Sequence, residues 1–153
     1  MVTGINCVDT MVIQDNRFIG IPWRFNGRDK NSGVDCIGLL VEFYKAHRWQ
    51  PAFDDGRLID REWFVKEKYR MLRYFLRHFE KTRSIAALEY GDIVLFEVYG
   101  EHHTGIYLEY DKFLSTFPPK SNEVTSYSFI DRLSYWGQFF ICGFKRRKAG
   151  EQS

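Results

Sequence analysis

Apolar residues recur with helical spacing in the first half of the chain. From residue 36 onward they occupy one face of a helix, at the positions Cys36, Leu39, Leu40, Phe43, Ala46 and His47. Asp35 is the predicted N-cap of this helix, and Gly33 allows the sharp turn that precedes it. The helix is predicted to end near residues 49–51, because a residue before proline is disfavoured in helical conformation.

Two further helices are expected on either side of this one. Residues 6–19 fit a short helix that Gly20 and Pro22 interrupt. Asp60 could cap a third helix, whose apolar positions are Phe64, Met71, Leu72, Phe75, Leu76 and Phe79. Its polar face carries a basic stripe, predicted to face solvent, made of Lys66, Lys68, Arg70, Arg73 and Arg77.

After residue 88 the pattern changes to short stretches rich in β-branched and aromatic residues, separated by polar or glycine-containing breaks. These stretches are GDIVLFEVYG, HTGIYLEY, KFLSTF, YSFI and QFFICGFKRR. They predict an antiparallel meander of about five strands. Helices that precede strands without βαβ alternation indicate an α+β fold, with N-terminal helices packed on one antiparallel sheet. We expect a single domain over residues 1–153.

Composition narrows the class of protein. The 153 residues are 44% hydrophobic and 18% aromatic, which is far from the composition of a disordered chain. A net charge of +2 predicts neither a nucleic-acid partner nor a membrane surface, and the basic residues 145–148 are interpreted as a solvated chain end. The N-terminus does not resemble a signal peptide and no segment reaches transmembrane length, so we expect synthesis in the cytoplasm and no membrane insertion.

Three cysteines at irregular spacing predict no disulfide framework. The sequence has no CxxC motif and no Cys/His cluster with zinc spacing, so we expect no structural metal site, and we expect no cofactor. Cys7 and Cys142 are interpreted as packing residues. Cys36 would lie in the first turn of its helix, where free N–H groups favour an anion, so the pKa of its thiol is predicted to fall below ~8.5. The alternative is that Cys36 simply packs in the core.

A cysteine nucleophile needs a base, usually histidine, which need not be near it in sequence. The adjacent residues His102 and His103 open a predicted strand and must face opposite sides of it. His103 would share a face with Gly105 and Tyr107, and Gly105 would leave room for the helix that bears Cys36. The alternative is a pair of strand-end histidines at the edge of solvent.

Three motifs occur together in one order: GVDCIGLL around Cys36, LEYGDIVLF at 88–96 and HTGIYLE at 103–109. Together with IGIPWRFNGRD at 19–29, they resemble the NlpC-type cell-wall cysteine peptidases over roughly residues 8–117. The bulky residue after the cysteine in DCIGL is more similar to the bacteriophage tail-associated branch than to the secreted bacterial enzymes.

This resemblance implies a papain-like fold and hydrolysis of the stem peptides of peptidoglycan. It implies that Cys36 is the nucleophile, that His103 is the general base, and that Asp35 helps to hold the free amine of the substrate. The backbone N–H of Cys36 would be the natural oxyanion donor.

The chain departs from the family pattern at several positions near the implied site. Trp23 replaces a common tyrosine at a substrate-binding position, Asn26 replaces a glycine, and Ile37 replaces a serine. Ser115 stands where a second histidine or another polar residue usually orients the base. A hairpin around residues 110–111 would bring Ser115 beside His103, where its hydroxyl could accept the second ring N–H. A backbone carbonyl is the alternative orienting group.

Three functions follow as hypotheses. The first is a peptidoglycan-directed cysteine peptidase, as a phage or prophage tail component that has other tail proteins as partners. The second is a non-catalytic tail-assembly module that retains the fold, since fold does not fix function. The third is an amidase or acyltransferase that acts as an antibacterial effector.

Overall fold

The computed structural model describes residues 15–57 and 66–148. Residues 15–17 are helical, and the rest of the helix predicted over 6–19 lies almost wholly outside the described residues, as do Cys7 and the predicted cap Asp60. The described elements are β1 (Arg28–Asp29), β2 (Gly33–Val34), α2 (Cys36–Ala46), α4 (Arg70–His78), β3 (Glu80–Thr82), η1 (Ile85–Ala87), β4 (Ile93–Val98), β5 (Glu101–Glu109), β6 (Lys112–Ser115), β7 (Phe129–Arg132), η2 (Leu133–Phe139) and β8 (Phe140–Lys145).

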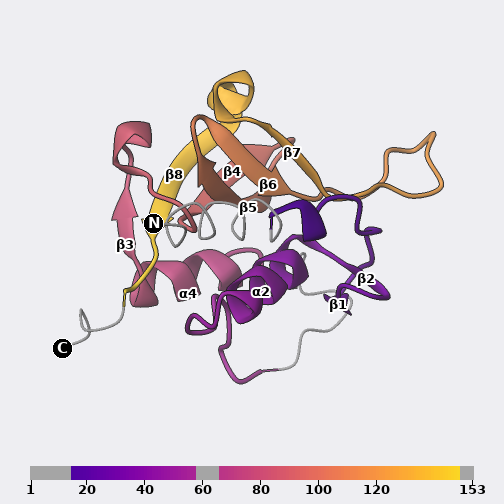
Figure 1. The fold of residues 1–153 in the computed structure, drawn as a ribbon, viewed down its shortest axis with the longest axis horizontal. Helices are drawn as coiled ribbons and strands as arrows, with labels where there is room; N and C mark the ends of the chain where they lie inside the picture. The colour runs from indigo at the N-terminus through magenta and orange to yellow at the C-terminus, as the bar shows by residue number, and fades with distance from the viewer. Residues whose placement is uncertain (1–14, 58–65, 149–153) are drawn as a thin grey trace, which may run out of the picture.

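The main sheet of the described chain has six strands in the order β3-β8-β4-β5-β6-β7, and every neighbouring pair is antiparallel. The predicted α+β fold with an antiparallel sheet is confirmed, and strands β4 to β7 form the predicted meander (Figure 1). The meander does not extend to the last strand, because β8 returns across the sheet to pair with β4. Strand β3 and the small β1-β2 sheet were not predicted, since each has only two or three residues.

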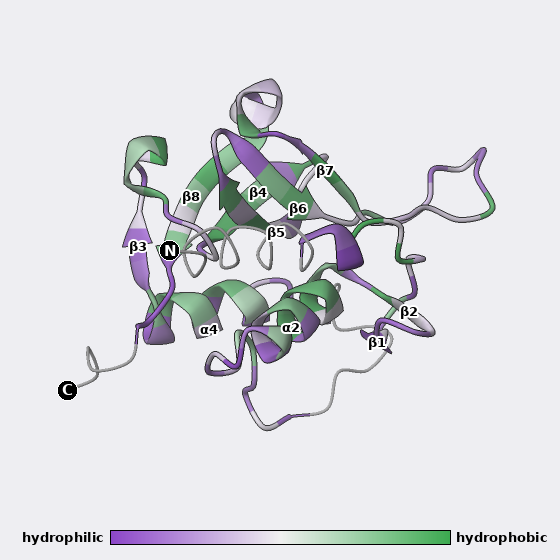
Figure 2. Cartoon of the chain, in the orientation of Figure 1, coloured by the Kyte–Doolittle hydropathy of each residue, from purple (hydrophilic) through white to green (hydrophobic). Residues whose placement is uncertain are grey.

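Apolar side chains cover both faces of this sheet. On one face α2 and α4 pack against β5 and β8 in a core that includes Leu39, Phe43, Phe75, Ile106 and Phe144. On the other face a second cluster joins Val94, Phe96 and Phe113 to aromatic residues of η2. Figure 2 shows hydrophobic residues on α2 and on the strands that it covers. Successive side chains along the strands therefore contribute to two separate hydrophobic cores, because both faces of the sheet are covered by other elements.

Helix α2 begins as predicted and ends earlier. Asp35 is the N-cap, and its side chain accepts a hydrogen bond from the N–H of Gly38 at 2.8 Å. The helix ends at Ala46, a few residues before the predicted boundary. Arg48 adopts a left-handed conformation with φ 59°, which stops the helix before proline can act on it. The ring of Trp49 then folds back and stacks on His47 with centroids 4.4 Å apart.

Glycines permit the close approach of the N-terminal segment to α2. A Cβ at Gly38 would lie 1.9 Å from the carbonyl oxygen of Gly27, and a Cβ at Gly27 would lie 2.2 Å from that of Gly33. No side chain fits at either place, because backbone atoms form the opposing surface. The packed backbone of residues 27–38 thus fixes the start of α2, where Cys36 lies.

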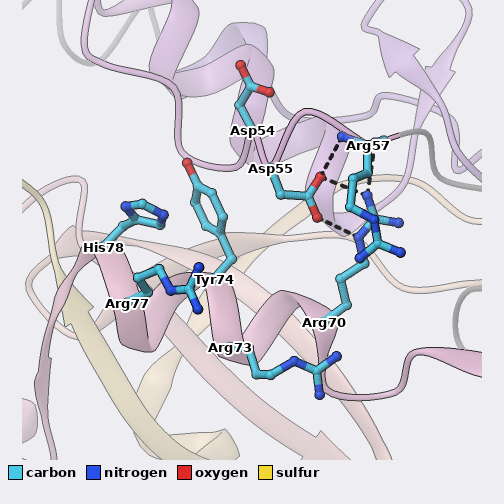
Figure 3. A pocket seen from close by; sticks show the side chains of 8 residues that line it. All are labelled: Asp54, Asp55, Arg57, Arg70, Arg73, Tyr74, Arg77 and His78. Atoms are coloured by element: carbon cyan, nitrogen blue, oxygen red, sulfur yellow. Dashed lines mark hydrogen bonds and ion pairs between the residues drawn. The ribbon is translucent and has the colours of Figure 1, made fainter.

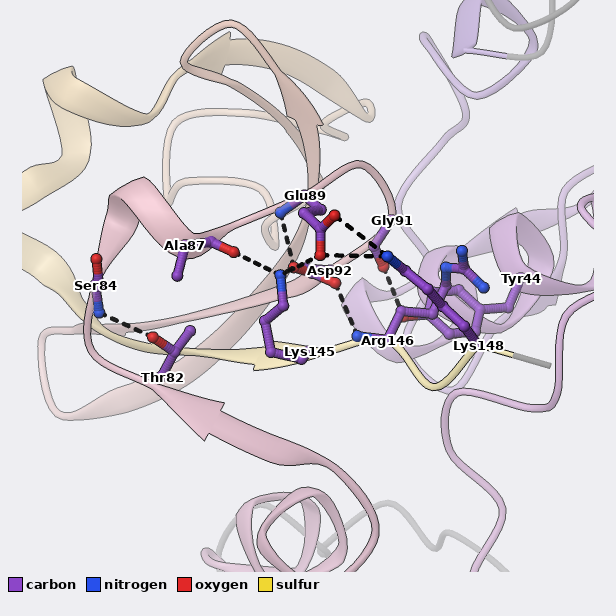
Figure 4. A network of polar contacts seen from close by, with 10 residues as sticks. All are labelled: Tyr44, Thr82, Ser84, Ala87, Glu89, Gly91, Asp92, Lys145, Arg146 and Lys148. Carbon is purple, nitrogen blue, oxygen red and sulfur yellow. Dashed lines mark hydrogen bonds and ion pairs between the residues drawn. The ribbon is translucent and has the colours of Figure 1, made fainter. Parts of the chain in front are cut away.

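The Gly-Asp motif before β4 has a structural role. Asp92 is buried and its carboxylate accepts hydrogen bonds from Lys145 Nζ at 2.6 Å and from the backbone N–H groups of Glu89 and Arg146 at 2.8 and 2.7 Å (Figure 4). The Tyr44 hydroxyl donates to the Gly91 carbonyl at 2.6 Å. The motif therefore ties α2 and the end of β8 to the start of β4.

Helix α4 differs from its prediction at one position of the basic stripe. Arg70 was predicted to face solvent, but its side chain is only 3% exposed and pairs with Asp55. The segment at residues 52–57 supplies this carboxylate, and sequence spacing within the helix could not reveal it. Among the described residues, no helix is long and apolar enough to cross a membrane.

Candidate active site

Cys36 and His103 line the same pocket, of about 200 Å³, although 66 residues separate them in the chain. Helix α2 contributes its first residue and β5 contributes the third residue from its start. The residues that line the pocket are Trp23, Phe25, Asp35, Cys36, Glu101, His103, Thr116 and Pro118. The two residues predicted to form the catalytic pair thus meet at one cavity.

The thiol of Cys36 is buried and neutral in this state. Burial raises its pKa to about 11, the charge of Asp35 adds to this effect, and contacts from Thr104 partly offset it. The predicted lowering of the pKa is therefore wrong. Desolvation outweighs the helix N-terminus, because the dipole is partly neutralised by the Asp35 carboxylate that caps the same turn.

The imidazole of His103 is also buried and neutral. Burial lowers its pKa to about 4, and the neighbouring His102 acts in the same direction. The ring of Phe117, from the segment that follows β6, lies 4.5 Å from the His103 ring. A neutral imidazole can accept a proton, so the resting site consists of a neutral thiol and a neutral base.

Glu101 provides the one carboxylate near the His103 ring in the described chain. Its Oε2 lies 3.8 Å from His103 Nε2, and its side chain is 65% exposed. Water screens this carboxylate, which explains why it does not offset the effect of burial on the imidazole pKa. This distance exceeds that of a hydrogen bond.

His102 faces the opposite side of β5, as strand alternation predicts. Its ring lies 5.8 Å from the ring of Tyr69, and its Nε2 lies 3.7 Å from Glu97. The predicted role of Gly105 is nevertheless wrong, because α2 packs on the face of β5 that carries Ile106 and not on the face of Gly105. A Cβ at Gly105 would instead meet Phe113 and Val94 of the second cluster.

Ser115 lies where the predicted hairpin places it, but it makes another contact. The hairpin turns at residues 110–111, and Ser115 pairs with Gly105. Its hydroxyl is buried and donates to the carbonyl of Thr104 at 2.7 Å. Within the described chain, no hydrogen bond joins Ser115 to the His103 ring. The ring beside that of His103 belongs to Phe117, two positions after Ser115, and it has no polar group to offer.

The carboxylate of Asp35 is fully engaged by the protein. Besides Gly38, it accepts from the backbone N–H of Asn26 at 3.0 Å and from Arg28 Nη1 at 2.8 Å, and its side chain is 2% exposed. Burial raises the pKa of this carboxyl, and Arg28 and the two N–H donors oppose the shift. The capping prediction is confirmed, whereas a free substrate amine would have to displace Arg28 to reach this group.

Two aromatic side chains line the pocket, and the first turn of α2 beside it has unused backbone donors. Trp23 is half-buried and its ring lies 6.4 Å from that of Phe25. The backbone N–H groups of Cys36 and Ile37 bind no other described residue, whereas those of Gly38 and Leu39 bond to Asp35. These two unused donors mark the place where an oxyanion would be stabilised.

Sequence reasoning missed three contributors to this site. Glu101 could have been found from strand alternation, since it shares a face with His103. Arg28 and Phe117 gave no such signal, because only the fold of the approach segment and of the loop after β6 brings them to Asp35 and His103.

The comparisons with known proteins agree with this architecture. The model of the NlpC/P60 family matches residues 20–144, and the chain therefore belongs to the NlpC/P60 family. No curated protein matches the sequence.

Solved structures share the fold at low sequence identity. The NlpC/p60 domain of the peptidoglycan hydrolase SagA is 19% identical with a TM-score of 0.53, and the match covers 88% of this chain and 95% of that one. An NLP/P60-family protein similar to a lipoprotein, from Staphylococcus aureus, is 19% identical with a TM-score of 0.55, covering 90% and 40% of the two chains. NlpC1 from Trichomonas vaginalis is 14% identical with a TM-score of 0.55, covering 89% and 42%. The chain thus spans about two fifths of the last two proteins.

Proposed function

We propose that this protein is a peptidoglycan-directed cysteine peptidase that cleaves stem peptides through an acyl-enzyme. The observation that carries the proposal is the meeting of Cys36 and His103 at one pocket at the N-terminus of α2. Family membership supports it, and so does the fold shared with a domain of a protein described as a peptidoglycan hydrolase.

The reaction begins from the neutral pair. As the Cys36 sulfur attacks the carbonyl carbon of the scissile amide, the thiol proton passes to the imidazole of His103. The imidazolium then gives this proton to the leaving amine, the C–N bond breaks, and a thioester remains on Cys36. In the second half, His103 takes a proton from water as the water oxygen attacks the thioester carbon. The C–S bond then breaks, and the imidazolium returns this proton to the Cys36 sulfur.

Transfer of the proton during attack fits the pKa values better than a preformed ion pair. With the thiol pKa near 11 and the imidazole pKa near 4, an isolated thiolate-imidazolium pair is strongly disfavoured in the empty pocket. The negative charge instead develops on the carbonyl oxygen, beside the free N–H groups of Cys36 and Ile37. The helix N-terminus acts on the transition state and not on the resting thiol.

Glu101 is the residue we propose as the positioning group for the base, in place of Ser115. The Ser115 hydroxyl already donates to Thr104, whereas the Glu101 carboxylate lies 3.8 Å from His103 Nε2. A carboxylate in this position would hold the ring tautomer and stabilise the imidazolium that forms during attack. Glu101→Gln should lower kcat and shift the acidic limb of the pH–rate profile to lower pH, because the imidazolium loses a stabilising charge. Ser115→Ala should leave the pH profile unchanged.

Substrate binding is proposed to rest on Trp23 and Phe25 more than on direct contact with Asp35. The two rings form an apolar wall of the pocket, which suits the alanine methyl groups of a stem peptide. Asp35 would act through the position of Arg28 and the start of α2. Asp35→Asn should therefore lower the stability of the fold together with activity, whereas Trp23→Ala should raise KM with little change in stability.

Digestion of purified peptidoglycan tests the proposal. The parent protein should release stem-peptide fragments that mass spectrometry assigns to one amide bond, and Cys36→Ala should release none. Cys142→Ala is the matched control, because Cys142 is a buried cysteine of β8 outside the pocket, and it should retain activity. Release of the same fragments by Cys36→Ala would refute the proposal, and transfer of an acyl group in place of hydrolysis would show an acyltransferase.

A non-catalytic module is the second candidate, and one observation favours it. The thiol of Cys36 is buried with a raised pKa, and it makes no hydrogen bond to His103 in the described chain. Such a module should bind peptidoglycan without releasing any fragment over prolonged incubation, and the digestion above separates the two.

The setting we propose is a phage or prophage tail, from which the protein would reach the cell wall without ordinary secretion. The support is the DCIGL sequence around Cys36. Tail genes on both sides of the coding sequence, and the protein in purified virions, are the expected findings. Absence from virions of a phage that encodes it would refute this setting and leave the proposed reaction intact.

A further inference from the structure

A second pocket, separate from the Cys36 site, lies between α4 and the segment at residues 54–57. Its volume is about 350 Å³, larger than that of the Cys36 pocket, and the two share no lining residue. The residues that line it are Asp54, Asp55, Arg57, Arg70, Arg73, Tyr74, Arg77 and His78 (Figure 3).

Carboxylates neutralise two of the four arginines. Arg70 donates through Nε and Nη2 to the two oxygens of Asp55, at 2.5 and 2.7 Å, and also bonds to the Arg57 carbonyl at 2.9 Å. Arg57 itself pairs with Glu67 at 2.5 Å. This network forms a rigid wall, because Arg70 is 3% exposed and held in a two-point contact.

The other two arginines have no counter-charge of their own. Arg73 and Arg77 lie one turn apart on α4, are exposed, and make no side-chain hydrogen bond or ion pair with another described residue. Like charges at this spacing on a helix repel each other. Asp54, on the facing segment, accepts a bond from the backbone N–H of Gly56 at 3.2 Å and is the remaining carboxylate of the lining.

The helix dipole accounts for only part of this arrangement. Arg77 and His78 lie in the last turn of α4, where positive charge is favourable. Arg73 lies in the middle of the helix, where the dipole gives it no advantage. A convex solvated face would also not form a cavity, whereas these side chains surround one together with the Tyr74 ring, which lies tilted against the His78 ring with centroids 4.4 Å apart.

We infer that this arginine pocket binds an oxyanion, a phosphate ester or a carboxylate, carried by the envelope polymer on which the protein acts. The identity of the polymer rests on the proposed function, while the binding of an oxyanion does not. Arg73 and Arg77 supply planar donor pairs that match two oxygens of such a group, and Tyr74 adds a hydroxyl. The pocket would hold the polymer while the Cys36 site acts on a peptide elsewhere along it.

Titration of the Cys36→Ala protein with inorganic phosphate tests the inference, because binding is then read without cleavage. Backbone amide NMR shifts of residues 70–78 should change and saturate at millimolar phosphate, with chloride keeping the ionic strength constant. Adding Arg73→Gln and Arg77→Gln should weaken this binding at least tenfold. The matched control is Lys112→Gln with Arg132→Gln, which removes two exposed cations paired across β6 and β7, and it should bind as the parent does.

The source of the oxyanion follows from two further titrations. Saturation by glycerol 3-phosphate but not by N-acetyl-D-glutamate would assign a polyol-phosphate polymer, and the reverse would assign peptide carboxylates. Shifts that do not saturate with phosphate, or an equal loss in the control variant, would overturn the inference. In protein with Cys36 intact, Arg73→Gln with Arg77→Gln should still cleave a soluble stem peptide at the parent rate, so a failure here is distinct from failure of the proposed function.

Discussion

Gly38→Ala places two physical effects in direct competition within α2. Alanine is the better helix former by about 1 kcal/mol, so intrinsic propensity predicts a more stable protein. The added Cβ would, however, lie 1.9 Å from the Gly27 carbonyl oxygen, 3.0 Å from the Gly27 carbonyl carbon and 3.2 Å from the Val34 Cβ. The nearest of these atoms belong to the backbone and cannot rotate away.

The size of the effect follows from the shift that is needed. The helix and the segment at Gly27 would have to separate by about 1.5 Å to restore ordinary contact, and overpacking of this kind costs about 1–3 kcal/mol or more. We expect a net loss of about 2 kcal/mol, which lowers the midpoint of thermal unfolding by about 4–8 °C in a chain of this size.

Thermal unfolding followed by circular dichroism measures this loss. Gly137→Ala is the matched control, because Gly137 is exposed in η2 and a Cβ there meets no atom within 4 Å. Its midpoint should stay the same or rise, since alanine reduces the entropy of the unfolded chain. A Gly38→Ala midpoint within about 1 °C of the parent, or above it, would refute the close packing of Gly27 on α2.

Three further predictions follow from buried groups. Because burial lowers the pKa of His103 to about 4, only the unfolded chain binds a proton at this residue between pH 6.5 and 4. The free energy of unfolding should therefore fall by on the order of 3 kcal/mol as the pH is lowered across that range. Urea titrations should show a smaller fall for His103→Gln, and equal falls would contradict the assignment. Because the pKa of Cys36 is about 11, iodoacetamide should label it at pH 7 more than a hundredfold slower than it labels an exposed cysteine. The labelling rate of Cys36 should then rise about tenfold with each pH unit. A rate that levels off below pH 8 would contradict this. Asp92→Ala should lower the free energy of unfolding by about 3 kcal/mol in denaturant titrations, since Lys145 and two backbone N–H groups lose their acceptor; a loss below about 1 kcal/mol would show that water replaces the carboxylate.

The periodic elements could be predicted because their signals are local. The apolar stripe from Cys36 gave α2 and its cap Asp35, and the alternation after residue 88 gave five of the six strands of the main sheet. The order of the strands could not be read in the same way. Pairing of β8 with β4 depends on contacts between residues 44 to 51 positions apart, which no local pattern encodes.

The candidate site could likewise be predicted only in the part that local motifs encode. Cys36 and His103 could be named from motifs, and the fold brings them to one pocket. Their pKa values could not be predicted, because burial by distant segments decides them. The partner of Ser115 was missed for a related reason, since the choice between the His103 ring and the Thr104 carbonyl depends on a side-chain orientation that strand register alone does not fix.

The central claim is that Cys36 becomes acylated by the substrate with His103 as the base. Intact-protein mass spectrometry after acid quenching of a reaction with a purified muropeptide tests it most directly. The account predicts a mass increase equal to the acyl portion of the cleaved peptide, located on Cys36 by digestion, and strongly reduced in His103→Ala. Fragment release without any adduct on Cys36, or an adduct of equal yield in Cys36→Ala, would contradict the account.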